Sequence, residues 1–167
     1  MPDFIILKKK ISQFNKTISI SGDKSISIRW VLFASLGSGI STSKNLLMSE
    51  DVFAAINAVK KLGIKVKLNK NKCKIYGRGI DGYTYKQNLS IDCKNSATLG
   101  RLILGLLINS PNLIKLVGDK SLSKRDFKRI SDPLSRFGAK FKLKKFKNLP
   151  LSMIGAKKLK SIQYEEN

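Results

Sequence analysis

Leu62-Gly63-Ile64-Lys65-Val66-Lys67-Leu68 is a stretch that recurs 75 residues later as Phe137-Gly138-Ala139-Lys140-Phe141-Lys142-Leu143. In each copy a glycine follows an apolar helical pattern, and alternating apolar and polar residues then predict a strand. A polar turn and another short strand follow each copy, at residues 74–77 and 151–155. Recurrence at a fixed spacing indicates an internal repeat, so we expect two copies of one structural unit.

The residues that precede each copy also correspond. Ser49 is expected to cap a helix that runs to Leu62, and Ser121 or Ser123 to begin another that runs to Phe137 with a kink at Pro133. A strand and an earlier apolar helix come before each of these, at 41–46 and 25–36 in the first unit and at 113–117 and 96–108 in the second. The alternating segment Thr17-Ile18-Ser19-Ile20 predicts the strand that opens the first unit. Two β-α-β-α-β-β units predict an α/β (α+β) fold with helices packed on one face of a mixed sheet.

Lysine dominates the charge of the chain. Among 167 residues, 33 are basic and 11 are acidic, for a formal net charge of +22. Such a charge ordinarily suggests nucleic acid or another polyanion. However, all but six of the basic residues are lysines scattered along the whole chain, and aromatic residues such as Phe53 and Phe137 fall on apolar helix stripes. Binding to single strands needs exposed aromatic rings beside the basic residues, so we expect no nucleic-acid partner.

The chain contains no histidine and two cysteines, Cys73 and Cys93. This content excludes the usual zinc sites and histidine acid–base chemistry, and it indicates no disulfide framework. The apolar patch at residues 4–7 precedes three lysines, the reverse of the order in a signal peptide, and the apolar run at 102–108 is too short to span a bilayer. We therefore expect a cytoplasmic protein with reduced thiols and no membrane partner.

The stretch Ser21-Gly22-Asp23-Lys24-Ser25-Ile26-Ser27-Ile28-Arg29 passes from a strand pattern to a helix pattern. A helix that begins near Ser25 presents free N–H groups and the positive end of its dipole to an anion. Lys24 lies at that start, and Arg29 lies one turn beyond Ser25 on the same face, so both suit a phosphate or carboxylate. A serine-capped helix with a solvated lysine and arginine fits the same residues. Asp23 separates Gly22 from Lys24, which excludes a Walker A loop.

Two further predicted helix starts carry polar or basic residues. Asn95, Ser96 and Thr98 stand at a strand-to-helix turn near the equivalent place in the second unit. The segment 118–125 adds lysines and Arg125 before another helix. Ordinary helix capping and a solvated basic turn are the alternatives for these two segments. If the helix starts share one sheet edge, they face a common cleft that suits a small substrate with two anionic groups.

Six blocks of the chain resemble the successive motifs of the 5-enolpyruvylshikimate-3-phosphate synthase family, the shikimate-pathway enolpyruvyl transferases. They fall in the family's order and cover essentially the whole chain. The blocks are Gly22-Asp23-Lys24-Ser25-Ile26-Ser27-x-Arg29, Asn45-Leu46-Leu47-x-Ser49-x-Asp51, Asp92-Cys93-x-Asn95-Ser96-x-Thr98-x-x-Arg101-Leu102, Gly118-Asp119-x-Ser121-Leu122-x-x-Arg125, Asp132-Pro133-Leu134 and Gly155-x-x-x-Leu159-Lys160-x-Ile162-x-Tyr164.

The resemblance implies transfer of the enolpyruvyl group of phosphoenolpyruvate to the 5-hydroxyl of shikimate 3-phosphate, through a tetrahedral intermediate and with release of phosphate. This is a step of chorismate and aromatic amino acid biosynthesis. It implies no metal and no organic cofactor, and a monomer for full-length members. By position, Lys24 matches the catalytic lysine that touches both substrates. The implied ligands of shikimate 3-phosphate are Lys24, Ser25 and Arg29, and those of phosphoenolpyruvate are Lys24, Asn95, Ala97, Thr98 and Arg125. Fixed cations and N–H dipoles suit two dianionic substrates.

Some positions depart from the family pattern. Ile28 replaces the usual histidine, Lys94 the usual glycine, and Asp126 the proline after the ligand arginine. A carboxylate at Asp126 would weaken the pull of Arg125 on an anion. Ala97 stands where many members have glycine, and its methyl group would obstruct glyphosate more than the shorter phosphoenolpyruvate, so the resemblance implies glyphosate tolerance.

The resemblance also implies an incomplete enzyme, because the family has two domains of three such units. Residues 1–16 would be an N-terminal strand region that belongs with a missing second domain. Residues 17–167 would be an incomplete domain with repeats at about 17–80 and 88–156 and the start of a third. We therefore expect a fragment that does not turn over alone. The alternative functions are UDP-N-acetylglucosamine enolpyruvyl transfer, a basic nucleic-acid-binding module, and an interaction protein that has lost catalysis.

Overall fold

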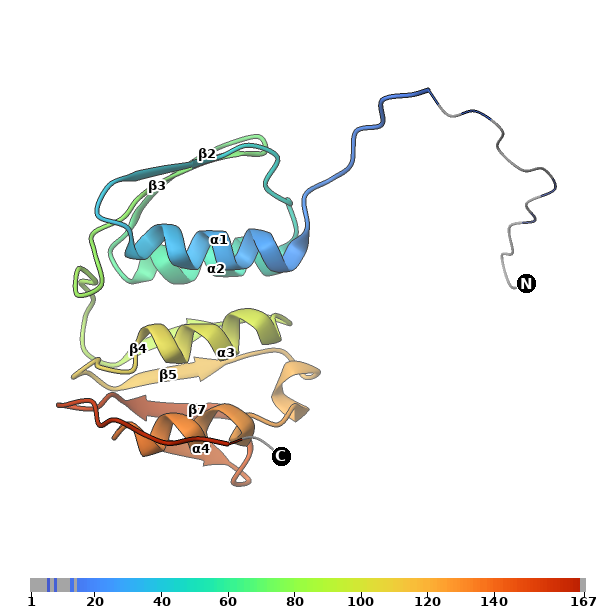
Figure 1. Cartoon of the computed structure of the whole chain (residues 1–167). Helices are drawn as coiled ribbons and strands as arrows, with labels where there is room; N and C mark the ends of the chain where they lie inside the picture. Colours follow the sequence, from blue (N-terminus) through green and yellow to red (C-terminus); the bar gives the residue numbers. More distant parts are fainter. Residues whose placement is uncertain (1–5, 7, 9–12, 14, 166–167) are drawn as a thin grey trace.

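The computed structural model describes residues 6, 8, 13 and 15–165. Residues 24–154 form two stacked α/β units (Figure 1). The first unit contains α1 (Lys24–Leu36), β1 (Ile40–Ser43), α2 (Glu50–Lys61), β2 (Lys65–Asn69) and β3 (Lys72–Tyr76). The second contains β4 (Leu89–Asp92), α3 (Ala97–Leu106), β5 (Ile114–Val117), the 3₁₀ turn η1 (Leu122–Lys124), α4 (Lys128–Arg136), β6 (Lys140–Lys144) and β7 (Asn148–Ile154).

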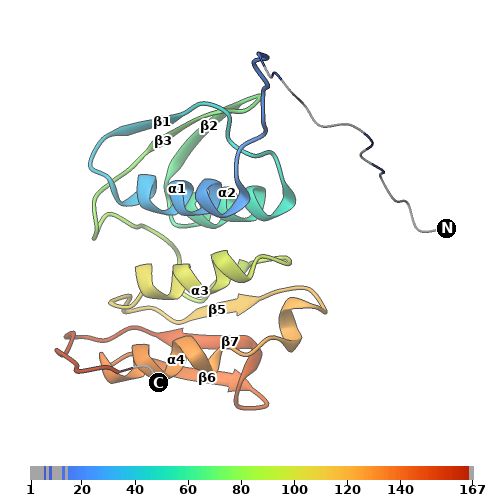
Figure 2. The ribbon, with the colours of Figure 1, turned by 45° about the vertical axis from the view of Figure 1, so that its right-hand side comes forward.

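Each unit builds one sheet and covers one face of it with helices (Figures 1 and 2). The first sheet has the order β1-β3-β2, and both strand pairs are antiparallel. The second has the order β4-β5-β7-β6, with β4 and β5 parallel and the other two pairs antiparallel. The predicted α/β fold with helices on one face of a sheet is therefore confirmed. Each unit has a sheet of its own: the second is mixed, as predicted, whereas the described strands of the first are all antiparallel.

Alternating burial explains why helices cover only one face of each sheet. Cys73 and Ile75 of β3 are fully buried, whereas the lysines between and before them are exposed. In β7, Leu149, Leu151 and Met153 are buried in the same alternating way. Because successive strand residues point to opposite faces, the apolar residues pack under the helices and the lysines face outward.

The glycine of each repeated stretch ends a helix in a backbone conformation with positive φ. The φ angles are +84° at Gly63, after α2, and +108° at Gly138, after α4. Residues that carry a side chain rarely adopt a positive φ, which explains why glycine recurs at this position. At Gly63 a Cβ atom would also lie 2.3 Å from the Thr84 hydroxyl oxygen. The predicted repeat of helix, glycine and strand is confirmed at both places.

The strand predicted at Thr17–Ile20 is wrong for the described structure. Residues 15–20 are exposed, form no strand, and lead away from the first sheet (Figure 1). The backbone at Gly22 passes so close to loop 45–47 that a Cβ atom there would lie 2.3 Å from the Asn45 carbonyl oxygen. The Asn45 side-chain amide also donates to the Ile20 carbonyl at 3.1 Å. These contacts direct the chain past the end of β1, so the alternating segment does not lie along its edge.

The helix predicted from Ser121 or Ser123 to Phe137 is instead two separate elements, η1 and α4. Phe127 is fully buried between them, and its N–H donates to the Lys147 carbonyl at 2.8 Å. The Asp126 carboxylate then accepts the Lys128 N–H at 2.7 Å and begins α4 anew. Burial of one aromatic side chain therefore outweighs the continuous helical pattern. Pro133 lies inside α4, which continues to Arg136.

The proposed division at residue 16 lies mostly outside the described residues and stays a prediction, as does the start of a third repeat. Among the residues that the structure describes, none of the helices has the length and apolar character needed to cross a membrane.

Candidate functional site

The helix starts that carry the predicted site residues lie at one end of the molecule. The first turns of α1, α2 and α3, together with η1, lie on the right-hand side of Figure 1. An ion pair and a hydrogen bond join the start of α1 to α2 and the loop before it, and a hydrogen bond joins the loops before α3 and η1. Because the positive ends of the helix dipoles lie on the same side, this end of the molecule favours anions.

Asp23 caps the first helix, and α1 begins at Lys24, one residue before the expected start. The Asp23 carboxylate accepts the Ile26 N–H at 2.7 Å. A serine cap at this helix is therefore wrong, because the carboxylate of Asp23 already occupies the capping position. Ser25, which is partly buried, and Arg29, which is exposed, lie one turn apart on the same helix. Arg29 forms no ion pair with any of the described acidic residues.

Lys24 forms an ion pair that the sequence reasoning did not assign. Its Nζ lies 3.3 Å from Oδ2 of Asp51, in the first turn of α2. The Lys24 side chain is 54% exposed, so water screens the pair and its net stabilisation is small. An anionic ligand can therefore compete with Asp51 for the ammonium group. Asp51 belongs to the second of the six sequence blocks. Its position in the first turn of a predicted helix is the sequence feature that could have indicated a role near Lys24.

A buried hydroxyl fixes the start of α1 against the loop before α2. Ser27 is 5% exposed, and its Oγ accepts the Leu47 N–H at 3.1 Å. Together with the close approach of Gly22 to Asn45, this bond sets the position of Lys24 relative to α2. The structure makes Ser27 a supporting residue of the site, although it stands between the ligand candidates Ser25 and Arg29.

The start of α3 is tied to the loop before η1. Ser96 caps α3 by accepting the Leu99 N–H at 3.3 Å, as its position predicts. The Asn95 amide donates to Oδ2 of Asp119 at 2.6 Å, and Oδ1 of Asp119 accepts the Leu122 N–H at 2.7 Å. The Leu122 N–H, and then Asn95, lower the pKa of Asp119 below its ordinary value. The ionised carboxylate of Asp119 thus connects the loop before α3 to η1, two of the segments predicted to bind an anion.

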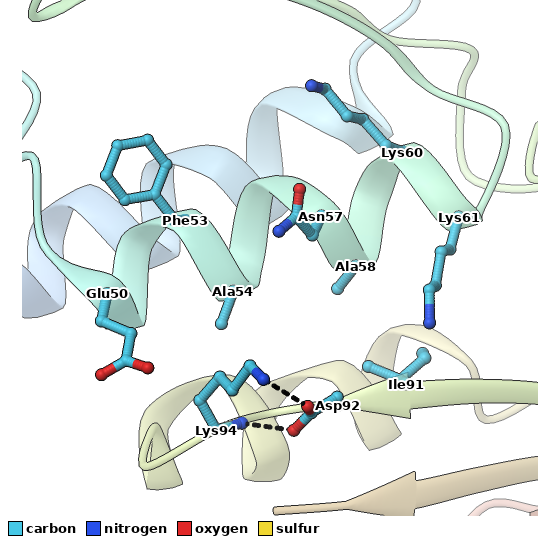
Figure 3. Close-up of a pocket in the computed structure, with 10 residues that line it drawn as sticks. All are labelled: Glu50, Phe53, Ala54, Asn57, Ala58, Lys60, Lys61, Ile91, Asp92 and Lys94. Atoms are coloured by element: carbon cyan, nitrogen blue, oxygen red, sulfur yellow. Dashed lines mark hydrogen bonds and ion pairs between the residues drawn. The ribbon is translucent and has the colours of Figure 1, made fainter.

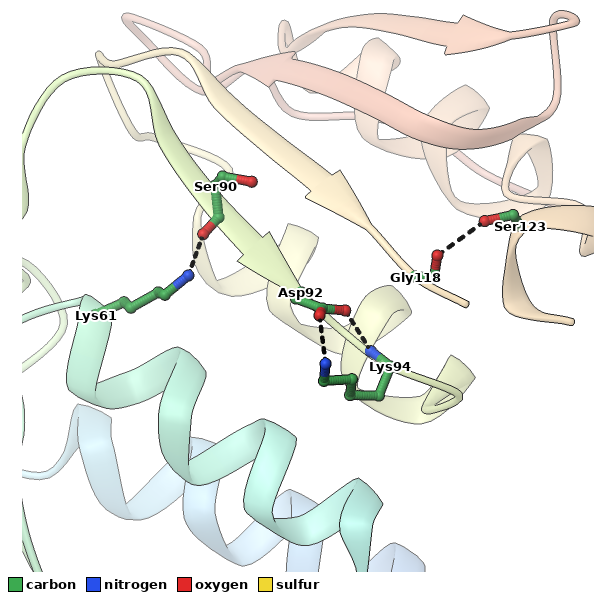
Figure 4. Close-up of polar contacts among 6 residues, drawn as sticks. All are labelled: Lys61, Ser90, Asp92, Lys94, Gly118 and Ser123. Carbon is green, nitrogen blue, oxygen red and sulfur yellow. Dashed lines mark hydrogen bonds and ion pairs between the residues drawn. The ribbon is translucent and has the colours of Figure 1, made fainter. Parts of the chain in front are cut away.

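Lys94, which stands where the family has glycine, has a φ of 51°. Two contacts with Asp92 stabilise this backbone conformation. The Asp92 carboxylate accepts the Lys94 N–H at 2.9 Å and forms an ion pair with Nζ of Lys94 at 2.9 Å (Figure 4). Burial opposes ionisation of Asp92, but the bonds from Lys94 outweigh it and lower the pKa of the carboxyl group. The Lys94 carbonyl also accepts the Asp119 N–H at 2.9 Å. The lysine is therefore folded back onto its own loop.

Arg125 follows η1 in extended conformation and is exposed. Its carbonyl accepts a bond from the Asn148 amide at 3.1 Å, which fixes the backbone. The Asp126 carboxylate accepts the Lys128 N–H and forms no ion pair with Arg125 among the described residues. That its charge weakens the pull of Arg125 on an anion stays a prediction. The Asp126 carbonyl, in turn, accepts a 3.4 Å bond from Arg101 of α3. Arg101 thereby links α3 to the segment that carries Arg125, and its Nε has no partner among the described residues.

A groove of about 620 Å³ runs between α2 and β4 (Figure 3). Its lining includes Glu50, Phe53, Asn57, Lys61 and Lys94, and none of the predicted ligand residues. The predicted ligand residues therefore lie at one end of the molecule and outside this groove. They are Lys24, Ser25, Arg29, Asn95, Ala97, Thr98 and Arg125. Both thiols are buried, and burial raises the pKa of Cys93 to about 12.

The comparisons with known proteins agree on one family. The family model of EPSP synthase (3-phosphoshikimate 1-carboxyvinyltransferase) matches residues 8–167. The chain is 40% identical over 153 residues to the 3-phosphoshikimate 1-carboxyvinyltransferase of Caldicellulosiruptor bescii and 38% identical over 160 residues to that of Streptococcus mutans. These alignments cover 91% and 95% of this chain but 35% and 37% of the relatives.

A solved structure gives the same result. The EPSP synthase from Acinetobacter baumannii superposes on this chain with a TM-score of 0.82 at 32% identity. The match covers 88% of this chain and 33% of that one. The chain thus spans about a third of the length of the relatives that it matches.

Proposed function

Because the chain belongs to the EPSP synthase family, we propose that its helix starts bind the substrates of 3-phosphoshikimate 1-carboxyvinyl transfer. In this reaction the enolpyruvyl group of phosphoenolpyruvate passes to the 5-hydroxyl of shikimate 3-phosphate, and phosphate is released. The relatives named above carry the name of this enzyme, so the comparisons do not favour UDP-N-acetylglucosamine enolpyruvyl transfer or a nucleic-acid-binding function. A cytoplasmic location is part of the proposal.

Shikimate 3-phosphate is proposed to bind at the start of α1. The partly buried Ser25 and the exposed Arg29 lie one helical turn apart, and Lys24 is the first residue of the helix. A guanidinium group can bind two phosphate oxygens at once, while the hydroxyl and the free N–H groups of the first turn donate to the others. Lys24 would exchange its exposed ion pair with Asp51 for contacts with substrate.

Phosphoenolpyruvate is proposed to bind between Lys24, the start of α3 and Arg125. Ala97 and Thr98 are the first two residues of α3, where N–H groups lack helical partners. Asn95 is held beside them by Asp119, and Arg125 supplies a cation from the neighbouring loop. Lys24 is the proposed catalytic group, placed to touch both substrates and to stabilise charge that develops between them. Ala97 would make the site tolerant to glyphosate, which is longer than phosphoenolpyruvate.

The observation that carries the proposal is the gathering of these helix starts at one end of the molecule (Figure 1). Calorimetric titration of the chain with shikimate 3-phosphate tests it. Loss of a charged hydrogen-bond partner costs about 1.5 to 3 kcal/mol, so Arg29→Ala should weaken binding by about ten- to a hundredfold. Lys67→Ala removes the same charge from an exposed position on β2 and serves as the control.

Binding that is lost in Arg29→Ala and retained in Lys67→Ala supports the assignment. Equal affinity of Arg29→Ala and the unmodified chain would contradict it, and so would equal weakening by the two substitutions, because the effect would then be one of net charge.

A further inference from the structure

The outer face of the first sheet carries four exposed lysines, which are called the lysine face below. Lys65 and Lys67 lie on β2, and Lys72 and Lys74 lie on β3. The residues that alternate with the lysines of β3 are fully buried under the helices, so the lysines point to the other side of the sheet. This side of the first unit faces away from the second unit (Figures 1 and 2).

The register of the two strands brings the charges of the lysine face close together. Lys67 lies directly opposite Lys74, and in antiparallel strands the Cβ atoms of such a pair are about 4.5 to 5.5 Å apart. Lys65 is the diagonal neighbour of Lys74, and Lys72 is the diagonal neighbour of Lys67. Like charges in directly opposite positions destabilise a sheet, so the repulsion within this face opposes folding.

No acidic side chain of the first sheet balances the lysine face. Residues 52–80 contain neither aspartate nor glutamate, and the four lysines form no ion pair with the described acidic residues. The second sheet also carries exposed lysines, but there Lys140 lies opposite Ile154 and Lys142 lies opposite Ser152. The first sheet therefore concentrates positive charge, whereas the second sheet separates its lysines with uncharged partners.

We propose that the lysine face binds a linear chain of linked phosphate groups, such as inorganic polyphosphate. A lysine ammonium group is a compact charge with three donors on a flexible stem, and it binds phosphate oxygens as a point charge. A phosphate placed between Lys67 and Lys74 replaces their mutual repulsion by attraction to both. Lysines two positions apart on one strand are separated by about 6.4 to 6.8 Å, so a chain of closely spaced charges contacts several of them at once.

Two other polyanions fit the lysine face less well. Single-stranded nucleic acid stacks its bases on exposed aromatic rings beside basic residues. The only aromatic residue of β1, β2 and β3 is Tyr76, which is partly buried and has Nζ of Lys65 over its ring at 5.2 Å. An anionic membrane is bound best when large apolar side chains enter it beside the basic ones. The large apolar side chains of β2 and β3 lie instead on the opposite face of the sheet, toward the helices.

The proposal does not rest on the binding of either substrate. The helix starts proposed to bind substrate belong to other elements than β2 and β3. Shikimate 3-phosphate carries one phosphate group and cannot contact the lysine face as a chain, so Lys67→Ala remains a control for substrate binding. Failure of one proposal therefore leaves the other standing.

Calorimetric titration of the whole chain with linear polyphosphate, at several salt concentrations, tests the proposal. Combined Lys67→Gln and Lys74→Gln substitutions should weaken binding by at least about tenfold, because two charged partners are lost. If each phosphate contact contributes as it does in nucleic acid, the slope of log affinity against log salt should also become shallower by about 1.4 to 1.8. Combined Lys140→Gln and Lys142→Gln substitutions are the matched control, since they remove the same charge from exposed strand positions on the second sheet.

Far-ultraviolet circular dichroism establishes that both double variants are folded. Polyphosphate binding that the first double variant loses and the control retains supports the proposal. Absence of binding to the unmodified chain would overturn it, and so would equal weakening by the two double variants, because net charge alone would then explain the affinity. Tighter binding of a single-stranded RNA with the same number of phosphates, or of vesicles of anionic phospholipid, would overturn the choice of a phosphate chain as the ligand.

Discussion

Replacement of Ser27 by alanine should loosen the start of α1 from the loop that precedes α2. Ser27 is 5% exposed, and its hydroxyl accepts the Leu47 N–H at 3.1 Å. Without the hydroxyl oxygen that N–H has no acceptor, and a partly buried donor left unpaired costs about 1 to 3 kcal/mol. Alanine is the better helix former by about 0.5 kcal/mol, so the net loss should be about 0.5 to 2.5 kcal/mol.

Ser25→Ala is the matched control for this prediction. Ser25 is only partly buried in the same helix, and its replacement makes the same gain in helix propensity without taking the acceptor from a buried N–H. The difference between the two variants should therefore equal the hydrogen-bond term, about 1 to 3 kcal/mol. For a chain of this size each kilocalorie per mole changes the melting temperature by about 2 to 4 °C.

Urea unfolding followed by circular dichroism measures both variants against the unmodified chain. The midpoint should fall for Ser27→Ala and hold or rise slightly for Ser25→Ala, with unchanged slopes. If both variants unfold at the same urea concentration, the bond from Leu47 contributes nothing, and the argument that Ser27 positions Lys24 fails.

Other measurements test separate parts of the structure. In an active family member that carries residues 92–101 of this chain, Ala97→Gly should lower the inhibition constant for glyphosate by about ten- to a hundredfold, with a smaller effect on the Michaelis constant for phosphoenolpyruvate. An unchanged inhibition constant would show that the Ala97 methyl group does not cause tolerance. Cys93, whose pKa is raised to about 12 mainly by burial, should react with iodoacetamide about a thousandfold more slowly in the folded chain than in urea, and equal rates would refute its burial. The pKa of Asp119 is lowered in the folded state, so the stabilisation from its carboxylate is complete above pH 3.8 and is lost as the pH falls through the pKa of the folded state. The difference in free energy of unfolding between the unmodified chain and Asp119→Ala should therefore become smaller in acid. A difference that does not change with pH would show that the Asp119 carboxylate does not stabilise the fold as an anion. Finally, the purified chain alone should release no phosphate from the two substrates, because reacting groups must be held together by a whole cleft; release above background would contradict this.

Local patterns were sufficient for the elements whose structure depends on near neighbours. The glycines at 63 and 138 end helices and precede strands because few other residues accept a positive φ at that place. Ser96 caps α3 because its hydroxyl reaches an N–H three residues ahead. The strands β2 and β6 lie close to their predicted positions because alternation with a period of two reports burial directly.

Sequence patterns failed where a distant partner decides the conformation. The alternating Thr17–Ile20 segment has the composition of a strand, yet a strand needs an edge, and contacts with Asn45 lead the chain past β1. The helix pattern before Phe137 is continuous, yet burial of Phe127 and its bond to Lys147 interrupt it. Both contacts join residues at least 20 positions apart. A pattern read from a short segment of the sequence therefore cannot reveal them.

The same division holds for the candidate site. The sequence alone determined the residue types at each helix start, and with them the preference for anions, because free N–H groups and basic side chains follow from local order. Only the tertiary structure decided that Lys24 pairs with Asp51, that Asp119 joins Asn95 to η1, and that the Asp126 carboxylate is occupied by the start of α4. The physical reason for the first two contacts is distance along the chain: packing within one unit brings Lys24 to Asp51, and packing within the other brings Asn95 to Asp119. Asp126 and Lys128 are near neighbours, and their bond forms because burial of Phe127 ends η1 and makes α4 begin there. The energy of a polar contact depends on packing as much as on the residues that make it.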